Sequence, residues 1–214
     1  MDGVVNGPPA RRRYDASGRR ARSAESRAGV LAAARHRFLT DGYGATTVTA
    51  VAADAHVSPE SVYKWFGSKA GLLRAVWERA LAGSAPTHAE RRSDAGSRAA
   101  VDGAAIIRSW ARLTAEVGAL ADPIHRLVQA AAYVDPEVAR LHAEIEGERS
   151  LRMEHNVDYL AAGGHLRADV TRDQARDVLL LYTTLYDRLV HEAGWTPSQL
   201  SAFVERGLTA HLLS

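Results

Sequence analysis

A chain of 214 residues with 46% hydrophobic residues has enough apolar sequence for a packed core in one or two domains. It has no cysteine, no apolar run near the roughly 20 residues that span a bilayer, and no hydrophobic signal core, so we expect a cytoplasmic protein without disulfides, thiolate metal sites or membrane contact. The net charge of +2 is unevenly divided, because residues 1–80 hold 13 Lys and Arg against 7 Asp and Glu, whereas residues 81–214 hold 14 against 18.

Residues 1–22 are rich in Gly, Pro and Arg and have almost nothing to bury, which is typical of a segment that is disordered when free. Two interpretations stay open. The segment is a solubilising tail or the remains of a leader, or it is a basic arm that follows a DNA backbone or enters a minor groove.

The next segment has the pattern of an amphipathic helix from about Ala24 to Thr40, which Gly42 ends. Its inner stripe consists of Val30, Leu31, Ala34 and Phe38. A shorter helix follows Thr46 and Thr47, whose hydroxyls suit an N-cap. Its apolar residues recur at i, i+3, i+4 and i+7, namely Val48, Val51, Ala52 and Ala55.

A third helix is predicted from near Pro59, because Ser58 can cap it and proline suits the first helical position. Val62 and Phe66 point inward, four residues apart. The remaining faces carry hydroxyls, an aromatic ring and a cation, on Pro59, Glu60, Ser61, Tyr63 and Lys64, with Trp65 near the boundary. Such a surface suits phosphates and base edges, so this pair of short helices predicts a reader of the DNA major groove.

Ser68 can cap a further helix whose first turn holds Lys69. The helix dipole disfavours a cation at that place, and a DNA phosphate would supply the reason for it. The helix carries inward-facing Leu72, Leu73, Val76, Trp77 and Leu81. We expect it to connect the DNA reader to the rest of the chain.

These segments resemble the DNA-binding domain of the TetR (tetracycline-repressor-like) family of bacterial transcription regulators. The matching residues are Val30, Leu31, Ala33, Ala34, Phe38, Gly42 and Tyr43, then Thr46–Val48, Val51, Ala52, Ala55, Val57 and Ser58, and finally Tyr63, Phe66, Ser68, Lys69, Leu72 and Leu73. The resemblance implies an all-α fold. It places a three-helix helix-turn-helix domain at residues 23–68 and a helical ligand-binding and dimerisation domain at residues 69–214, with residues 69–82 as the connecting helix.

The resemblance also implies which side chains meet DNA. It assigns phosphate contacts to Thr47, Ser61, Tyr63 and Lys69. It places Ser58, Pro59, Glu60, Lys64 and Trp65 at the floor of the groove or its edges.

Three residues depart from the family pattern. His56 replaces glycine at the turn, where a left-handed backbone would be strained. Glu60 replaces another frequent glycine and puts a carboxylate near DNA, which is tolerable if it accepts from a cytosine amino group. Arg37 stands at a usually apolar position, from which it extends into solvent or reaches a phosphate.

The C-terminal part is predicted to be helical apart from a loop at residues 83–97, where Gly, Ser, Pro and mixed charge show no periodicity. One helix should run from Asp135-Pro136 to Ala162, before Gly163-Gly164. Further helical segments are predicted to start near Ser97, Asp122, Thr171 and Thr196. No alternation typical of a sheet occurs.

The last two helices carry more apolar surface than a terminal hairpin could hide on one small core. In the family such a pair packs against its twin, so the resemblance implies a homodimer through these helices; the alternative is that they only close the monomer core. A two-fold dimer sets two recognition helices about 34 Å apart, so its double-stranded DNA operator should be near-palindromic. The resemblance further implies a repressor that a small-molecule effector releases.

A regulator of this kind needs a cavity for its effector. Aromatic, soft or amphipathic residues of the middle helices are candidates for its lining. They are Trp110, His125, Tyr133, Met153, Asn156, Tyr159, Tyr182 and Tyr186. For any one of them, a place in the core is the competing interpretation.

The sequence does not favour an enzyme. His142 with Glu146, and Asp187 with His191, have the i, i+4 spacing of a shared helix face, but such pairs are usually solvated ion pairs. There is no HExxH motif, no set of paired Glu-x-x-His motifs and no Gly-rich phosphate loop. We therefore expect no metal, no cofactor and no catalysis. The alternatives are a ligand-independent DNA-binding protein and a helical-bundle metalloenzyme.

Overall fold

The computed structural model describes residues 16–83 and 87–214, and its regular structure there is helical. In chain order the elements are α1 (Ala16–Thr40), α2 (Gly42–Ala45), α3 (Val48–Asp54), α4 (Pro59–Phe66), α5 (Lys69–Ala82), α6 (Ala89–Ala99), α7 (Gly103–Ala132), α8 (Pro136–Ala162), α9 (Arg172–Tyr182), the π-helix η1 (Asp187–Glu192) and α10 (Pro197–Leu212). One isolated bridge, between Leu166 and Leu213, is the only β-type pairing among the described residues. The predicted all-α fold class is confirmed.

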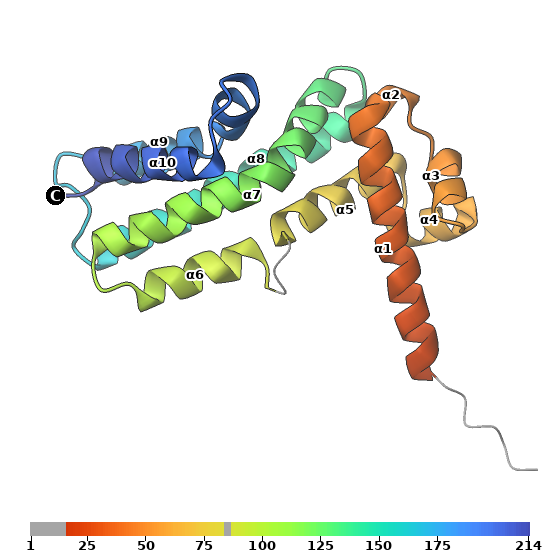
Figure 1. The fold of residues 1–214 in the computed structure, drawn as a ribbon, viewed down its shortest axis with the longest axis horizontal. Coiled ribbons are helices and arrows are strands. Elements are labelled where there is room, and N and C mark those ends of the chain that lie inside the picture. The colour runs from red at the N-terminus through yellow and green to blue at the C-terminus, as the bar shows by residue number, and fades with distance from the viewer. Residues whose placement is uncertain (1–15, 84–86) are drawn as a thin grey trace, which may run out of the picture.

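The molecule is elongated, with α1 to α4 at one end and α9, α10 and the C-terminus at the other (Figure 1). The long helices α7 and α8 pack together and extend from one end to the other. Along this pair, α5 and α6 pack on α7, α10 packs on α7, and α9 packs on α8. No helix in the described part of the chain is both long and apolar enough to cross a membrane.

Buried apolar side chains form two clusters, and α7 and α8 contribute to both. The first joins α1 and α3 to α5, the second half of α7 and the first half of α8, with Phe38, Leu73 and Ile124 fully buried in it. The second joins the first half of α7 to the end of α8, α9 and α10, with Leu160 and Leu200 at its centre. The helices that follow α4 thus complete the core of the end that holds α1 to α4.

Local capping fixes the short helices of the first end where the sequence predicts them. The hydroxyl of Thr47 accepts a hydrogen bond from the amide of Ala50 at 3.1 Å, and Ser58 accepts from the amide of Ser61 at 3.3 Å. Ser68 caps α5 in the same way. Each such cap contributes about 1 kcal/mol to the stability of its helix.

The first helix is longer than expected, because α1 begins at Ala16 rather than near Ala24. The last seven residues of the predicted disordered arm, 16–22, are therefore helical. Residues 16–22 contain Ala and Arg, which favour helix, and no proline. The rest of the predicted arm, residues 1–15, lies outside the described residues.

The predicted loop at residues 83–97 is wrong over most of its length, since α6 begins at Ala89. The buried face of α6 is made of small polar residues, Ser93 and Ser97, and it lacks the apolar stripe that sequence analysis seeks. Gly96 lies against the side chain of Ser109 so closely that a Cβ would overlap it. Close packing against α7 thus stabilises α6, although α6 has almost no hydrophobic pattern.

Two further boundaries differ from expectation. Pro123 does not start a helix but lies inside α7, where buried Ala121 and Ile124 on either side pack into the core. The helix predicted to start near Thr171 stops at Tyr182, where the hydroxyls of Thr183 and Thr184 donate to the carbonyls of Leu180 and Leu181. It resumes as η1. Tertiary packing and these side-chain hydrogen bonds outweigh the local pattern.

Candidate DNA interface and ligand cavity

The outer face of α4 presents the polar residues that the sequence predicts. Tyr63 is 52% exposed, and Glu60 and Lys64 are exposed. Among the described residues none of these three side chains makes a hydrogen bond or an ion pair, so the side-chain polar groups are available to a partner. Val62, on the opposite side, is buried in the first core and fixes the rotation of the helix.

The hydroxyl residues predicted to contact phosphates lie at the helix starts and take part in capping there. Thr47 and Ser58 are exposed at the first turns of α3 and α4. Ser61 is half-buried, with its Oγ 3.1 Å from the Oγ of Ser58. Pro59 is half-buried at the first position of α4.

Trp65 lies at the edge of the outer face and turns toward α1. Its ring is half-buried, edge-on to Phe66, and the guanidinium of Arg27 lies 5.5 Å from its centroid. Arg27 is thereby an exposed cation beside α4 that the sequence analysis did not single out, because nothing in the sequence links residues 27 and 65.

The backbone of His56 has φ of 53°, in the left-handed region, and it is the only such non-glycine residue among those described. The turn does not adjust to avoid the strain that the sequence predicts. Arg37 has a partner in the protein, because its Nε and Nη2 donate to the carboxylate of Asp54 at 2.5 and 2.9 Å. The departure at Arg37 is thus explained by an ion pair between α1 and α3.

Lys69 has a partner that the sequence analysis missed. Its Nζ lies 4.1 Å from the ring centroid of Tyr43 and 3.4 Å from the carbonyl oxygen of Gly44, and burial lowers its pKa, an effect that Asp135 opposes. The hydroxyl of Tyr43 donates to Asp135 Oδ2 at 2.8 Å. These contacts favour a cation at the start of α5 without DNA, and a phosphate contact from Lys69 stays a prediction.

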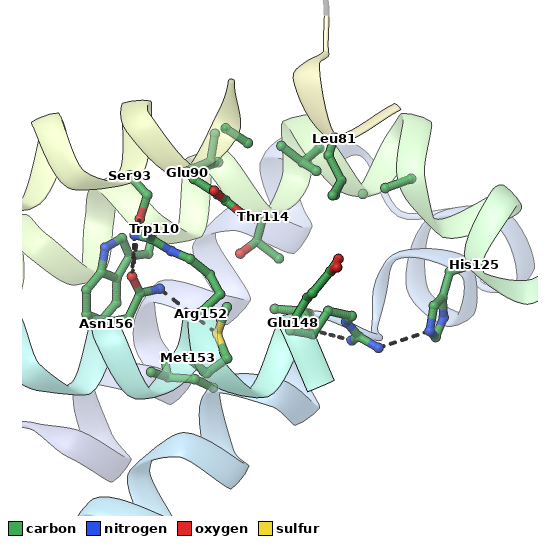
Figure 2. A pocket seen from close by; sticks show the side chains of 18 of the residues that line it. Leu81, Glu90, Ser93, Trp110, Thr114, His125, Glu148, Arg152, Met153 and Asn156 are labelled. Carbon is green, nitrogen blue, oxygen red and sulfur yellow. Dashed lines mark hydrogen bonds between the residues drawn. The ribbon is translucent and has the colours of Figure 1, made fainter. Parts of the chain in front are cut away.

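A cavity of about 370 Å³ lies among α5 to α10, in the middle of the molecule. This volume falls within the range of sites for small molecules. Figure 2 shows its walls, with Leu81 of α5 across from Met153 of α8, and with Trp110 and Thr114 supplied by α7. The wall from α5 belongs to the helix that also packs in the DNA-binding core.

Five of the eight residues predicted for the cavity line it, namely Trp110, His125, Met153, Asn156 and Tyr182. The other three do not. Tyr133 is 91% exposed where α7 ends, because the chain turns there toward α8. Tyr159 lies further along α8 against His155, and Tyr186 is buried with its ring against Gly118, in the second core.

The sequence analysis missed the charged side chains of the lining. Arg152 donates to Asp94 at 2.6 Å and to the side-chain oxygen of Asn156 at 2.8 Å, and Trp110 donates to Ser97 at 2.9 Å. Figure 2 shows Arg152 beside Asn156 in the cavity wall. Burial acts to raise the pKa of Asp94, but the hydrogen bond and charge of Arg152 lower it overall. Spacing along α8 suggests the bond to Asn156, four residues on, but gives no sign of the bond to Asp94, which is on α6.

Arg74 of α5 is similarly bound by acidic residues. It donates to Glu78 at 2.9 Å and to Glu144 at 3.2 Å, and it also bonds to Glu148. Asp122 is a buried carboxylate in the lining whose Oδ2 has no hydrogen-bond partner among the described residues, although Arg126 Nε lies 3.6 Å away. Burial raises its pKa.

Two histidines and a carboxylate meet where the cavity approaches α5. His125 Nε2 lies 2.6 Å from Glu146 Oε1, and Arg149 Nη1 lies 3.0 Å from the same nitrogen and 2.7 Å from the same oxygen. His142 Nε2 lies 4.0 Å from Glu146 Oε1. Burial lowers the pKa of His125; it acts to raise that of Glu146, which His125 and Arg149 lower overall. These three residues offer the donor set of a metal ion.

The comparisons with known proteins agree with this geometry. Residues 30–76, from the middle of α1 to α5, match the sequence model of the family described as bacterial regulatory proteins, tetR family. No curated protein sequence matches the chain significantly.

Several solved structures share the fold. A bacterial regulatory protein in the tetR family from Rhodococcus RHA1 has 21% identity and a TM-score of 0.64, over 89% of this chain and 98% of its own. NalD of Pseudomonas aeruginosa, the secondary repressor of the MexAB-OprM multidrug efflux pump, has 18% identity and a TM-score of 0.66, over 90% and 97%. A protein described as a transcriptional regulator from Saccharomonospora viridis, in complex with choline, has 15% identity and a TM-score of 0.65, over 89% and 99%.

Proposed function

Given that this chain belongs, through its N-terminal domain, to the TetR family of bacterial regulatory proteins, we propose that it represses transcription as an operator-bound homodimer that a small molecule releases. The observation that carries the DNA-binding part is the outer face of α4. There Tyr63 and Lys64 are exposed and without partners among the described residues. A short, capped helix with such a face fits the major groove.

A direct test is to select bound sequences from random duplex DNA. The expected product is a near-palindrome whose half-sites are about one helical turn apart. Lys64→Ala should change the preferred bases, and Tyr63→Phe should weaken all sequences alike, because the first contacts base edges and the second a phosphate. The exposed Arg112 of α7 and Tyr133 lie outside α4 and outside the last helices, so Arg112→Ala and Tyr133→Phe serve as matched controls. No enriched sequence, or no effect of either α4 variant, overturns the proposal.

The dimer part of the proposal is supported by apolar surface near the C-terminus. Leu181 of α9 is 61% exposed, and the neighbouring Leu185, Leu189 and Phe203 are only partly buried. An exposed patch of this kind is typical of an interface between proteins. We infer that two copies pair through α9, η1 and α10, which sets the two α4 helices on one side of the duplex.

Release by a ligand is supported by the position of α5. Trp77 is buried in the DNA-binding core and also lines the cavity, and Arg74 and Leu81 line it on either side. A ligand that prefers a displaced α5 would shift the population toward dimers whose α4 helices no longer fit the operator. Whatever its chemical structure, the effector must bind the conformation with displaced α5 more tightly than the conformation that binds the operator.

The release step is tested by filling the cavity. A screen of small apolar and cationic compounds, including choline because a protein of the same fold holds it, should give compounds that raise the melting temperature and release the operator. Thr114 is half-buried in the wall, so Thr114→Phe should abolish both effects while leaving operator binding intact. A ligand that acts equally on this variant binds elsewhere and contradicts the assignment of the cavity.

A further inference from the structure

We propose that His125 of α7 and His142 and Glu146 of α8 bind a divalent transition-metal ion of the zinc type, at the place where the cavity approaches α5. One ligand atom from each residue lies within 4.8 Å of the other two. Two imidazole nitrogens and a carboxylate oxygen are a common ligand set for zinc, with a fourth position left for solvent.

Two of the three distances between the ligand atoms lie within about an ångström of the separation that zinc requires, and the third, between the two histidines, is at most 4.8 Å. With metal–ligand bonds of about 2.0–2.1 Å in a tetrahedron, two ligand atoms are separated by about 3.3 Å. The separation of His125 Nε2 from Glu146 Oε1 is 2.6 Å, and that of His142 Nε2 from the same oxygen is 4.0 Å. Movement of the tips of the half-exposed His142 and Glu146 side chains by less than about an ångström brings both values to the tetrahedral spacing.

The ring of His142 is a polar group without a use in the metal-free protein. Its Nε2 is buried and has no hydrogen-bond partner among the described residues, which is a costly state for such a nitrogen. The nitrogen faces Glu146, four residues further along α8. A metal ion between the two would satisfy it.

The contacts of His125 conflict in the same way. Its Nε2 faces the acceptor Glu146 Oε1 and the donor Arg149 Nη1 together. A neutral ring nitrogen either donates a hydrogen or accepts one, so it satisfies only one of these neighbours. A lone pair directed at a metal ion shared with Glu146 removes the conflict.

Arg149 supplies the positive charge at this place when no metal is bound. Its Nη1 bonds to Glu146 Oε1 at 2.7 Å, and its Nη2 bonds to the hydroxyl of Thr183 at 2.8 Å. A metal ion would displace the first contact and leave the second. The arginine is therefore a competitor of the metal, and its removal should have the opposite effect to removal of a ligand.

The site has an entry path and a connection to the DNA-binding end. The side chains of Glu146 and His142 are 41% and 30% exposed, so an ion can enter from solvent. On the inner side, the ring of His125 lies 5.8 Å from that of Trp77 on α5. A metal that fixes His125 also fixes a neighbour of the connecting helix. An effect on operator binding follows from this contact and rests on the proposed function, whereas metal uptake does not.

The test begins with protein freed of metal by a chelator and dialysed against Zn²⁺, with zinc measured per chain and the melting temperature recorded. We expect one zinc per chain and a higher melting temperature. His142→Gln and Glu146→Gln should each lower the affinity by more than the roughly 10–100-fold that a change outside the ligand sphere costs. His155→Gln is the matched control, since His155 is also on α8 and lies 3.3 Å from a carboxylate, that of Asp94.

The His142→Gln variant distinguishes a loss of zinc binding from a failure to fold. Because His142 Nε2 makes no hydrogen bond, the variant should melt at the wild-type temperature without zinc and lose only the increase that zinc produces. Arg149→Met should bind zinc at least as tightly as the wild type. Co²⁺ in place of Zn²⁺ should give the visible absorption of a tetrahedral complex in the wild type and not in His142→Gln.

Absence of stoichiometric zinc in the wild type, or equal zinc binding by His142→Gln and His155→Gln, overturns the proposal. Measurement of operator affinity with and without Zn²⁺ then tests the coupling separately. A change in the wild type that is lost in His142→Gln supports coupling. Zinc uptake without any change in operator affinity supports the site and overturns the coupling.

Discussion

The outer face of α4 and the wall of the cavity differ in whether their charged side chains form ion pairs. Lys64 and Glu60 have no ion pair among the described residues, whereas Arg74 and Arg152 in the cavity wall are each bound to carboxylates. An unpaired cation on a rigid helix can bind a polyanion without first breaking an ion pair within the protein. A paired arginine must first exchange partners, so the cavity favours neutral ligands or ligands that replace an existing ion pair.

The same difference extends to how each region affects the fold. The α4 face can lose a polar side chain without loss of internal contacts. The cavity wall cannot, because its charged groups also hold α5, α6 and α8 together.

The largest effect is expected for Leu181→Glu, which places a charge in the proposed dimer interface. The variant should be monomeric by light scattering at micromolar concentration. Its operator affinity should fall by about 10²–10⁴-fold, because the two half-sites are no longer bound by linked domains. Val101→Glu, at an exposed valine between α6 and α7, should remain dimeric. A dimeric Leu181→Glu protein would place the interface elsewhere.

Arg152→Met should destabilise the protein by about 1–3 kcal/mol, since Asp94 and the oxygen of Asn156 each lose their shortest hydrogen bond, a charged one, and keep only longer contacts with His155, Arg98 and Ser93. Lys64→Met should leave the stability unchanged and weaken DNA binding. Urea unfolding of both variants measures the difference. Equal stability of the two variants would contradict the contrast between the two regions.

Tyr43→Phe removes the hydrogen bond to Asp135 and should cost about 1 kcal/mol at pH 7. The Tyr43 hydroxyl holds the pKa of Asp135 below its ordinary value of 3.8, with Lys69 and the amides of Glu137 and Val138 acting in the same direction. The stabilisation is therefore present above pH 3.8 and is lost as the pH falls through the folded pKa. The gap between wild type and variant should accordingly close in acid, and Asp135→Asn should show no such change.

The smallest effect is expected at the turn before α4. His56→Gly relieves a left-handed backbone but adds freedom to the unfolded chain, so the net gain in stability should be below about 1 kcal/mol. Thermal melting measures it. A loss of stability would mean that the His56 side chain contributes a contact greater than the strain.

The sequence predicts the DNA-binding end well because its determinants are local. The caps at Thr47 and Ser58 and the inward Val62 are set within a few residues of one another, and all are confirmed. The helix of Pro136–Ala162 is likewise confirmed, since Asp135 caps it.

The cavity is less predictable because its determinants are distant in sequence. Trp110 and Met153 are recognisable as large side chains at helical spacing, but Asp94, the carboxylate partner of Arg152, is on another helix. The helix α6 escapes prediction because Ser93 and Ser97 replace its apolar stripe. Three tyrosines are misplaced for the same reason, since residue type alone does not tell a cavity wall from a core or an exposed helix end.

We propose that α4 binds in the major groove of DNA and that a ligand in the cavity changes the position of α4 through α5. Hydrogen exchange of the full chain, with and without the selected duplex, tests this claim most directly. Slower exchange on DNA binding should be confined to residues 46–69, and a ligand that releases DNA should alter exchange in residues 69–82. Protection by DNA that falls on α6 to α10 and leaves α4 unchanged would contradict the account.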